Sequence, residues 1–467
     1  MRKCLTSMRC NEVYNLKAVF LTVAASLLLY LSHVANAQDF FEIVDIQDTQ
    51  AEESSSKPWQ FRGHIQQELK YGLQAPDSSY AFERNTSGLS QFRTETFLEF
   101  KYRFSNDLSA QISAKNEIDY LRWEAGEKNW QIKNYDTLLK DAYVDYTFSN
   151  DLWLRVGNQV IAWGESEGLS ITDVLSTQDF REPGQAALED IRESLPAILL
   201  SKPFTVGDSN SNLNLALTYK AGTDRYAQTQ EDFYPLVTFK TANTATNYSD
   251  LHPGKDWELA FQYIVHANGG DYAFVLAETN KNTPELFNLQ LDTQTDQISN
   301  VEFFQRRQLF YGISANKVIN SFLLRSEFGV ITDSELPSGS NVELVRNKEK
   351  RLMFGTEYSG WTDWLFSLEY DYLDRSPRSY SLIDERSSGF VLRTQYTAFN
   401  EKLITQLWYL KLADQGGEIS RLTFTYKPID NWEINAAYVI YENDKPNSTL
   451  YPFRNNDTIN LALKYGF

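Results

Sequence analysis

The last ten residues of the chain, 458–467, read TINLALKYGF and decide the fold. Along them, apolar side chains alternate with polar or small ones at a period of two residues, which is the pattern of a β-strand whose two faces meet different surroundings. One face carries Ile459, Leu461, Leu463, Tyr465 and Phe467, and the other carries Asn460, Ala462, Lys464 and Gly466. The chain therefore ends in a strand with one apolar and one wet face.

The same alternation recurs upstream. Between residues 92 and 104, Phe92, Leu98, Phe100, Tyr102 and Phe104 alternate with Arg93, Glu95, Glu99, Lys101 and Arg103. Segments of about 10 to 14 residues with this period number eighteen. They begin near residues 59, 90, 108, 137, 151, 196, 212, 256, 271, 301, 320, 350, 363, 387, 402, 418, 431 and 457.

The connections between these segments alternate in length. One set is short, at residues 105–107, 149–151, 267–270, 360–362, 400–401 and 428–430. The intervening set is mostly long, including residues 72–89, 164–195, 222–255, 280–300 and 333–349. Short turns at one end and long loops at the other are typical of a transmembrane antiparallel β-barrel, in which the short turns are periplasmic. We expect an all-β barrel of about 18 strands over residues 58–467, with 16 strands as the alternative.

A water-soluble β-sandwich or propeller is the competing interpretation. Against it, the segments are long enough to cross a bilayer at a tilt, and tryptophans cluster at their ends, as in the aromatic girdles of membrane barrels. These are Trp59, Trp123, Trp153, Trp163, Trp257, Trp361, Trp408 and Trp432. Beyond residue 37, no stretch approaches 18 consecutive apolar residues, so helical membrane spans are excluded.

The N-terminus has the features of a secretory signal. Positive charges precede an apolar core at residues 18–31, and Ala35-Asn36-Ala37 fits the small-x-small cleavage rule, so we expect cleavage near Ala37. Cleavage removes Cys4 and Cys10, the two cysteines of the chain, so the mature protein has no disulfide and no cysteine chemistry. The acidic segment that follows, 38–57, is either a disordered tail or a contact for the lumen or a periplasmic partner.

The charge balance excludes a further class. The 467 residues include 44 Lys and Arg against 62 Asp and Glu, a formal net charge of −18. A chain this acidic repels a phosphate backbone, so we expect no nucleic acid among its partners.

Two motifs carry a family resemblance. The aromatic C-terminal residue, Phe467, resembles the assembly signal of Gram-negative outer-membrane barrels, which implies the barrel-assembly machinery as a partner of the last strand. Arg155-Val156-Gly157-Asn158-Gln159, followed by Trp163-Gly164-Glu165-Ser166, is similar to the corresponding strand and loop of an uncharacterised proteobacterial porin-like family of the porin superfamily. The resemblance implies an outer-membrane address, with outer-membrane lipid and lipopolysaccharide as surroundings, and no established substrate.

The third long loop, 164–195, is the candidate pore constriction. It is acidic, and in the porins that the chain resembles the third loop often folds into the lumen. An acidic loop opposite arginines of the wall would set up a transverse field that sorts solutes by sign and size; a solvated surface loop is the alternative. The candidate constriction residues are Arg93, Arg103, Arg155, Gln159, Glu165, Glu167, Asp173 and Arg181.

The sequence gives little support to catalysis. After cleavage only His64, His252 and His266 remain, and none is close in sequence to a nucleophile or a second ligand. No metal-ligand spacing and no glycine-rich phosphate loop is present, so we expect neither an enzyme nor a cofactor or metal.

The function that these features favour is a porin-like channel for passive diffusion of small solutes. One alternative is an export conduit for a lipid or hydrophobic product that works with an inner-membrane transporter, and this predicts an apolar lumen. Another is a closed surface or structural barrel. A second copy of the chain is a further candidate partner.

Overall fold

The structure is a computed structural model that describes residues 57–74, 87–124, 127–166, 168, 170–186, 188–219, 222–227, 232–233, 246–247, 257–283, 285–292, 297–304, 307–338, 343–376, 386–413, 416–443 and 450–467. The predicted signal and almost all of the predicted segment 38–57 lie outside these residues. So does Glu167.

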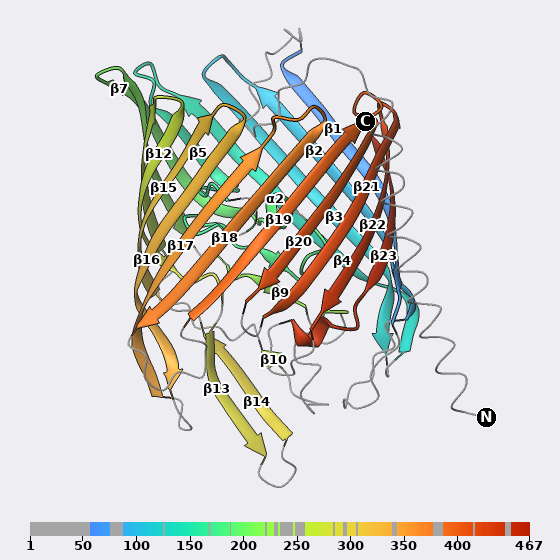
Figure 1. The fold of residues 1–467 in the computed structure, drawn as a ribbon. Helices are drawn as coiled ribbons and strands as arrows, with labels where there is room; N and C mark the ends of the chain where they lie inside the picture. Colours follow the sequence, from blue (N-terminus) through green and yellow to red (C-terminus); the bar gives the residue numbers. More distant parts are fainter. Residues whose placement is uncertain are drawn as a thin grey trace, which may run out of the picture.

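Eighteen strands form one antiparallel sheet, which confirms the predicted strand number. The sheet closes into a barrel because β1 pairs with β2 on one side and with β23 on the other (Figure 1). In chain order the strands are β1 (Trp59–Gly72), β2 (Gly88–Arg103), β3 (Leu108–Glu124), β4 (Glu127–Thr147), β5 (Trp153–Gln159), β7 (Leu195–Val206), β8 (Ser209–Tyr219), β11 (Trp257–Ala267), β12 (Gly270–Asn280), β15 (Arg307–Ile319), β16 (Phe322–Ser338), β17 (Glu343–Tyr358), β18 (Trp364–Ser376), β19 (Arg386–Ala398), β20 (Leu403–Leu412), β21 (Gly417–Ile429), β22 (Trp432–Glu442) and β23 (Thr458–Gly466).

Shorter elements lie outside the barrel sheet. They are β6 (Asp179–Phe180), α2 (Leu188–Ile191), β9 (Arg225–Tyr226), β10 (Thr246–Asn247), β13 (Glu285–Asp292), β14 (Gln297–Phe304) and the 3-10 turn η3 (Tyr451–Phe453). The hairpin of β13 and β14 projects from the lower end of the barrel in Figure 1. In the part of the chain that the structure describes, no helix has the length and apolar character needed to cross a membrane.

The short turns lie together at the upper end of the barrel, where the chain also ends (Figure 1). Between β11 and β12 the turn is Asn268-Gly269, and both residues have positive φ, at 53° and 72°. Positive φ at both central residues is the requirement of the two-residue hairpin turn that matches strand twist, and asparagine and glycine tolerate it best. At the end of the chain, the backbone of Phe467 exchanges two hydrogen bonds of 2.9 Å with Gly63 and so completes the seam.

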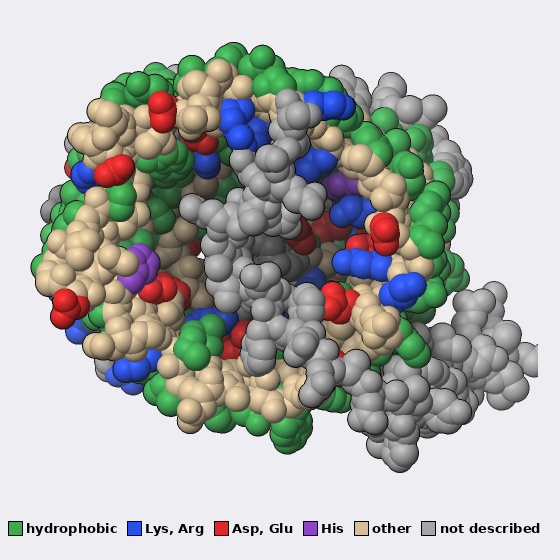
Figure 2. All heavy atoms as spheres, turned by 90° about the horizontal axis from the view of Figure 1, so that it is seen from above, with side chains coloured by type: hydrophobic (Ala, Val, Ile, Leu, Met, Phe, Trp, Pro, Cys, Tyr) green, Lys and Arg blue, Asp and Glu red, His purple; other side chains and the backbone are tan. Residues whose placement is uncertain are grey.

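The two faces of the wall have opposite chemistry. Leu98, Phe100, Leu461 and Leu463 are exposed on the outside, whereas Glu99 is buried on the inside. Viewed from the short-turn end, apolar side chains surround the outside of the barrel and charged ones lie on its inner side (Figure 2). An outward apolar band with a polar interior is the arrangement of a transmembrane β-barrel.

The tryptophans follow the girdle prediction only in part. Trp59, Trp257, Trp361 and Trp432 are exposed at or next to strand ends, as expected. By contrast, Trp163 and Trp408 pack against apolar clusters inside the barrel. Alternation alone cannot identify these two because loops fold into the lumen and create an apolar core there.

Candidate functional site in the barrel lumen

The loop between β5 and β7, residues 160–194, runs inside the barrel. It leaves the wall directly after Gln159, four residues before the predicted start at 164, because β5 is only 7 residues long. Gly157 precedes this exit with φ 139°, and a Cβ atom at this position would lie 2.1 Å from the carbonyl oxygen of Ala142 on β4. The neighbouring strand therefore requires glycine here. We call residues 160–194 the lumen loop.

Two carboxylates on the wall hold the first half of the lumen loop. Glu327 on β16, which is 1% exposed, accepts backbone N–H bonds from Glu165 and Ser166 at Oε1 (2.7 and 2.9 Å). Its Oε2 accepts the N–H groups of Ile171 and Thr172, each at 2.7 Å, and the Thr172 hydroxyl at 3.0 Å. Glu369 on β18 accepts the hydroxyl of Ser166 at 2.7 Å. A buried carboxylate with five donors fixes the loop backbone firmly.

Apolar packing seals this sector of the lumen. Ile161, Ile171 and Leu175 of the lumen loop pack on inward residues of β7, β8, β11, β12 and β15 to β17. Those inward residues are mostly small, which leaves room for the loop: Ala197, Ala216, Ala260, Val275, Ala277, Phe310, Ile331 and Met353. At Gly329 on β16 a Cβ atom would lie 2.6 Å from the side chain of Ile171. This side of the barrel is thus a packed core rather than a water path.

The second half of the lumen loop crosses to the opposite wall. The Glu182 carboxylate binds Lys70 Nζ at 2.7 Å, Arg93 Nη2 at 2.5 Å and Gln91 Nε2 at 2.9 Å. Next to it, the hydroxyl of Tyr441 on β22 donates to the carbonyl of Pro183 at 2.7 Å. The loop is therefore tied to both sides of the barrel and spans the lumen.

A second loop joins the first. Residues 222–227 of the connection between β8 and β11 enter the lumen, and β9 pairs in parallel with β6 of the lumen loop. Arg225 Nη2 lies 2.5 Å from Asp136 on β4, and its Nη1 lies 2.9 Å from Glu193. Arg181 binds the same Asp136 at 3.1 Å and Asp179 at 2.6 Å. Both loops and the wall therefore meet in one network of paired charges.

Burial and ion pairing shift the pKa values of three carboxyl groups in and beside this network. Burial raises the pKa of Asp179, but its hydrogen bonds and ion pairs with Arg181 outweigh burial, so the pKa lies below the ordinary value. Burial likewise opposes ionisation of Glu182, yet the charges of Arg93 and Lys70 hold its pKa well below the ordinary value. Asp224, beside the β6–β9 pair, lacks a cation of this kind, and burial raises its pKa to about 6.

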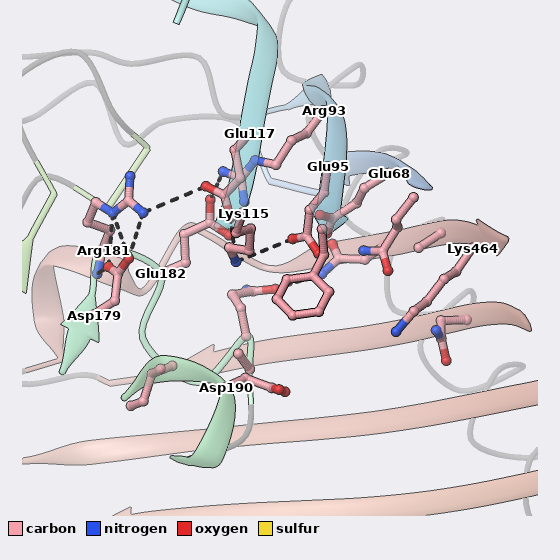
Figure 3. Close-up of a pocket in the computed structure, with 18 of the residues that line it drawn as sticks. Glu68, Arg93, Glu95, Lys115, Glu117, Asp179, Arg181, Glu182, Asp190 and Lys464 are labelled. Carbon is pink, nitrogen blue, oxygen red and sulfur yellow. Dashed lines mark hydrogen bonds and ion pairs between the residues drawn. The ribbon is translucent and has the colours of Figure 1, made fainter. Parts of the chain in front are cut away.

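A polar cavity of about 1260 Å³ lies between the lumen loop and the wall formed by β1 to β4 and β20 to β23. Arg62, Glu433 and Lys464 line it near the short turns, and Asp179, Arg181 and Asp190 line it at the loop. In Figure 3, acidic and basic side chains of the wall and the loop converge on this space. The cavity extends from the short-turn end of the barrel to the lumen loop.

Among the predicted constriction residues, Arg93 and Arg181 line the cavity, and Arg93 meets the acidic loop through Glu182. Asp173 lies inside the loop, where it binds Arg192 at 2.7 Å. Glu165 accepts a hydrogen bond of 2.7 Å from Asn316 on β15.

The remaining predicted residues lie elsewhere on the wall. Arg155 pairs with Asp145 on β4 at 2.7 Å and stacks on Tyr143, so its charge is directed at the neighbouring strand and away from the loop. Gln159 is buried and donates to the Ala197 carbonyl at 3.2 Å. Arg103 is the exposed last residue of β2 at the short-turn end. None of these three is among the described residues that line the cavity.

Several residues of the site have no signal in the sequence. Glu327, Glu369, Lys70 and Arg225 lie far along the chain from the lumen loop that they contact, and their local sequences are ordinary strand or loop. The alternation of their strands gives Glu327, Glu369 and Lys70 an inward parity, which points to the lumen but not to the loop that they contact. Within the described ranges, no group of three or more His, Cys, Asp or Glu residues could hold a metal ion.

Comparisons with known proteins agree with this fold. A family model described as "protein of unknown function (DUF1302)" matches residues 113–339, which include the motif from Arg155 to Ser166. No curated protein matches the sequence. Among solved structures, OccAB3 of Acinetobacter baumannii is 13% identical, with 88% of this chain and 99% of that chain covered, at a TM-score of 0.50.

A second structure, OccK8 (OprE) of Pseudomonas aeruginosa, is 9% identical over 88% of this chain and 98% of that chain, also at a TM-score of 0.50. At such identities the likeness concerns the fold. The chain therefore folds as an 18-stranded transmembrane barrel, and its resemblance to an uncharacterised porin-like family is confirmed.

Proposed function

We propose that the protein is an outer-membrane channel through which small hydrophilic solutes diffuse passively, filtered by size and charge. One observation carries the proposal, namely the polar cavity of about 1260 Å³ between the wall and a loop tied across the lumen. Size selection follows from the lumen loop, because the five hydrogen bonds that Glu327 accepts and the contacts of Glu182 hold the loop rigidly in the path of the solute.

Charge selection follows from the paired groups that line the constriction. A pore with both signs on its walls presents a transverse field, and solutes with a fitting dipole or charge pass more easily than others. In this proposal the charged group at the constriction consists of Arg181, Arg225, Asp136 and Asp179.

The lining speaks against a conduit for hydrophobic cargo. Such a conduit needs an apolar path, whereas the apolar side of this lumen is filled by Ile171, Leu175 and their neighbours. The cavity left beside that core is lined largely by charged side chains, which would have to be desolvated against a lipid chain at high cost.

The test is single-channel recording of the refolded mature barrel in a planar bilayer, followed by vesicle swelling with neutral sugars of increasing size. We expect stable conductance steps, permeation by the smallest sugars and exclusion of the larger ones. A folded barrel, recognised by its heat-modifiable migration in electrophoresis, that gives no conductance above the lipid background would refute the proposal and favour a closed surface barrel.

A further inference from the structure

Phe97 on β2 is an aromatic residue on the inner face of the barrel wall. Leu98 and Phe100 are exposed on the outside, so the alternation of the strand turns Phe97 into the lumen. Among the described residues that line the polar cavity, Phe97 is the only one with a phenyl, phenol or indole ring. An accessible apolar ring among polar groups is a feature of ligand sites, in which a few aromatic side chains and a few placed polar groups fix the ligand.

The ring of Phe97 is held by its register partner on β1, His64. The centroids of the two rings lie 5.4 Å apart, at an interplanar angle of 24°. His64 is fixed in turn by Glu95, whose Oε1 lies 2.9 Å from Nε2. Phe97 is half-buried and, among the described residues, belongs to neither of the two apolar clusters inside the barrel. The ring is therefore fixed in position without being packed into a core, and its free surface is available to a solute in the cavity.

The charges on the wall around this ring are balanced locally. At three places, register partners on adjacent strands carry opposite charges: Arg62 with Glu99, Glu68 with Arg93, and Lys464 with Glu433. The like-charged partners Glu95 and Glu117 share Lys115, whose Nζ lies 3.3 Å from the first and 2.7 Å from the second (Figure 3). Such a wall offers little net charge to an ion, whereas paired carboxylates and ammonium groups keep lone pairs and N–H groups for the hydroxyls of a solute.

The part of the cavity lining on β20 to β23 is largely uncharged. Amides and a hydroxyl come from Gln406, Asn435 and Thr423, and the small side chains of Ala437 and Ala462 leave room beside them. Amides and hydroxyls both donate and accept hydrogen bonds, as the hydroxyls of a solute do. This side of the cavity therefore matches a molecule with many hydroxyl groups better than it matches an ion.

We infer that the cavity binds a neutral sugar whose ring stacks on Phe97. A sugar has no charge, its hydroxyls both donate and accept, and one face of its ring carries C–H groups that pack on an aromatic ring. A linear polyol lacks that face, and a carboxylate would have to compete with Glu95 and Glu117 for Lys115. The inference rests on the proposed function, because it names the class of solute that the same cavity takes.

The test is saturation-transfer NMR on the refolded mature barrel in a detergent without a sugar head group, with glucose as the probe. We expect saturable transfer to glucose, with half-saturation on the order of 1–10 mM. Phe97→Leu keeps an apolar side chain but removes the ring, and it should raise the half-saturation concentration about fivefold. Phe97→Tyr keeps the ring, and Val160→Ala shortens another apolar residue of the lining, so both should bind glucose as the wild type does. Heat-modifiable migration shows that each variant is folded.

Two further probes distinguish the class of solute. Sorbitol, the open-chain counterpart of glucose, should bind about fivefold more weakly, and benzoate, which has a ring and a negative charge, should not displace glucose. Equal binding of glucose and sorbitol, tighter binding of benzoate, or unchanged glucose binding by Phe97→Leu would each overturn the inference. The NMR measurement does not depend on conduction. A barrel that conducts without binding glucose would therefore overturn this inference alone, and one that binds glucose without conducting would overturn the proposed function alone.

Discussion

Replacing Glu327 with glutamine tests whether wall carboxylates hold the lumen loop across the barrel. The carboxylate accepts five hydrogen bonds, two at Oε1 and three at Oε2, four of them from backbone N–H groups. An amide has one acceptor oxygen, so Glu327→Gln turns an NH2 group toward at least two N–H donors. Losing two charge-assisted bonds at about 1.5–3 kcal/mol each weakens the loop by about 3–6 kcal/mol.

The cost falls on the loop and leaves the barrel in place, because β16 keeps its ladders with β15 and β17. We expect larger and noisier single-channel conductance, together with trypsin cleavage after Arg181 that the wild type resists. Glu258→Gln is the matched control, since Glu258 is an equally buried carboxylate on β11 whose partners are Asn280 and Thr218. A folded Glu327→Gln barrel with wild-type conductance and protease resistance would refute the reasoning.

Three further perturbations address the loops. Gly329→Ala places a Cβ atom 2.6 Å from Ile171, and this overpacking should destabilise the packing of the lumen loop by about 1–3 kcal/mol and raise the conductance. Gly355→Ala, whose Cβ atom would lie 3.2 Å from its nearest neighbour, should leave the conductance unchanged. Equal effects of the two substitutions would count against the packing argument. Arg225→Gln removes one cation from the proposed constriction. The repulsion between the Arg225 charge and a monovalent cation passing about 6 Å away in water is about 0.7 kcal/mol, so the cation-to-anion permeability ratio from reversal potentials should rise about threefold. An unchanged ratio would place Arg225 outside the ion path. Burial raises the pKa of Asp224 from 3.8 to about 6. The free energy of local opening around Asp224 is therefore highest below the ordinary pKa, where the carboxyl is protonated, and falls as pH rises through about 6. Exchange of the Gln178 amide, corrected for intrinsic rates, should therefore be slower at about pH 5 than at about pH 7.5, and Asp224→Asn should abolish the difference.

The strands were predictable because each one records its own environment. Along residues 458–467 every second side chain is apolar, and the structure places those side chains outside and the others inside. Strand ends were less predictable. β4 begins at Glu127, ten residues before the predicted 137, because its ladder with β3 continues after β5 has left the wall. Pairing with another segment decides where a strand ends, and the local alternation of side chains does not show where that pairing stops.

The residues that line the cavity were predictable only in outline. Loop length and acidity pointed to the lumen loop, and Arg93 and Arg181 do line the cavity. The expected role of Arg155 depended on which residue lies opposite it. The structure places Asp145 there at 2.7 Å, so the charge of Arg155 is paired within the wall. The decisive anchor, Glu327, is an isolated glutamate in a strand and has no sequence signature.

The sequence by itself determined that the chain forms a barrel, how many strands it has and which side chains face out, because a period of two and the lengths of turns are local properties. The tertiary structure alone decided where the polar cavity lies. The contacts of Glu182 with Lys70 and Arg93, of Glu327 with residues 165–172, and of Arg225 with Asp136 join positions that are 89 to 162 residues apart in the chain. Closure of the sheet brings these groups together, and burial in the lumen then makes their hydrogen bonds and charges strong enough to hold the loops across it.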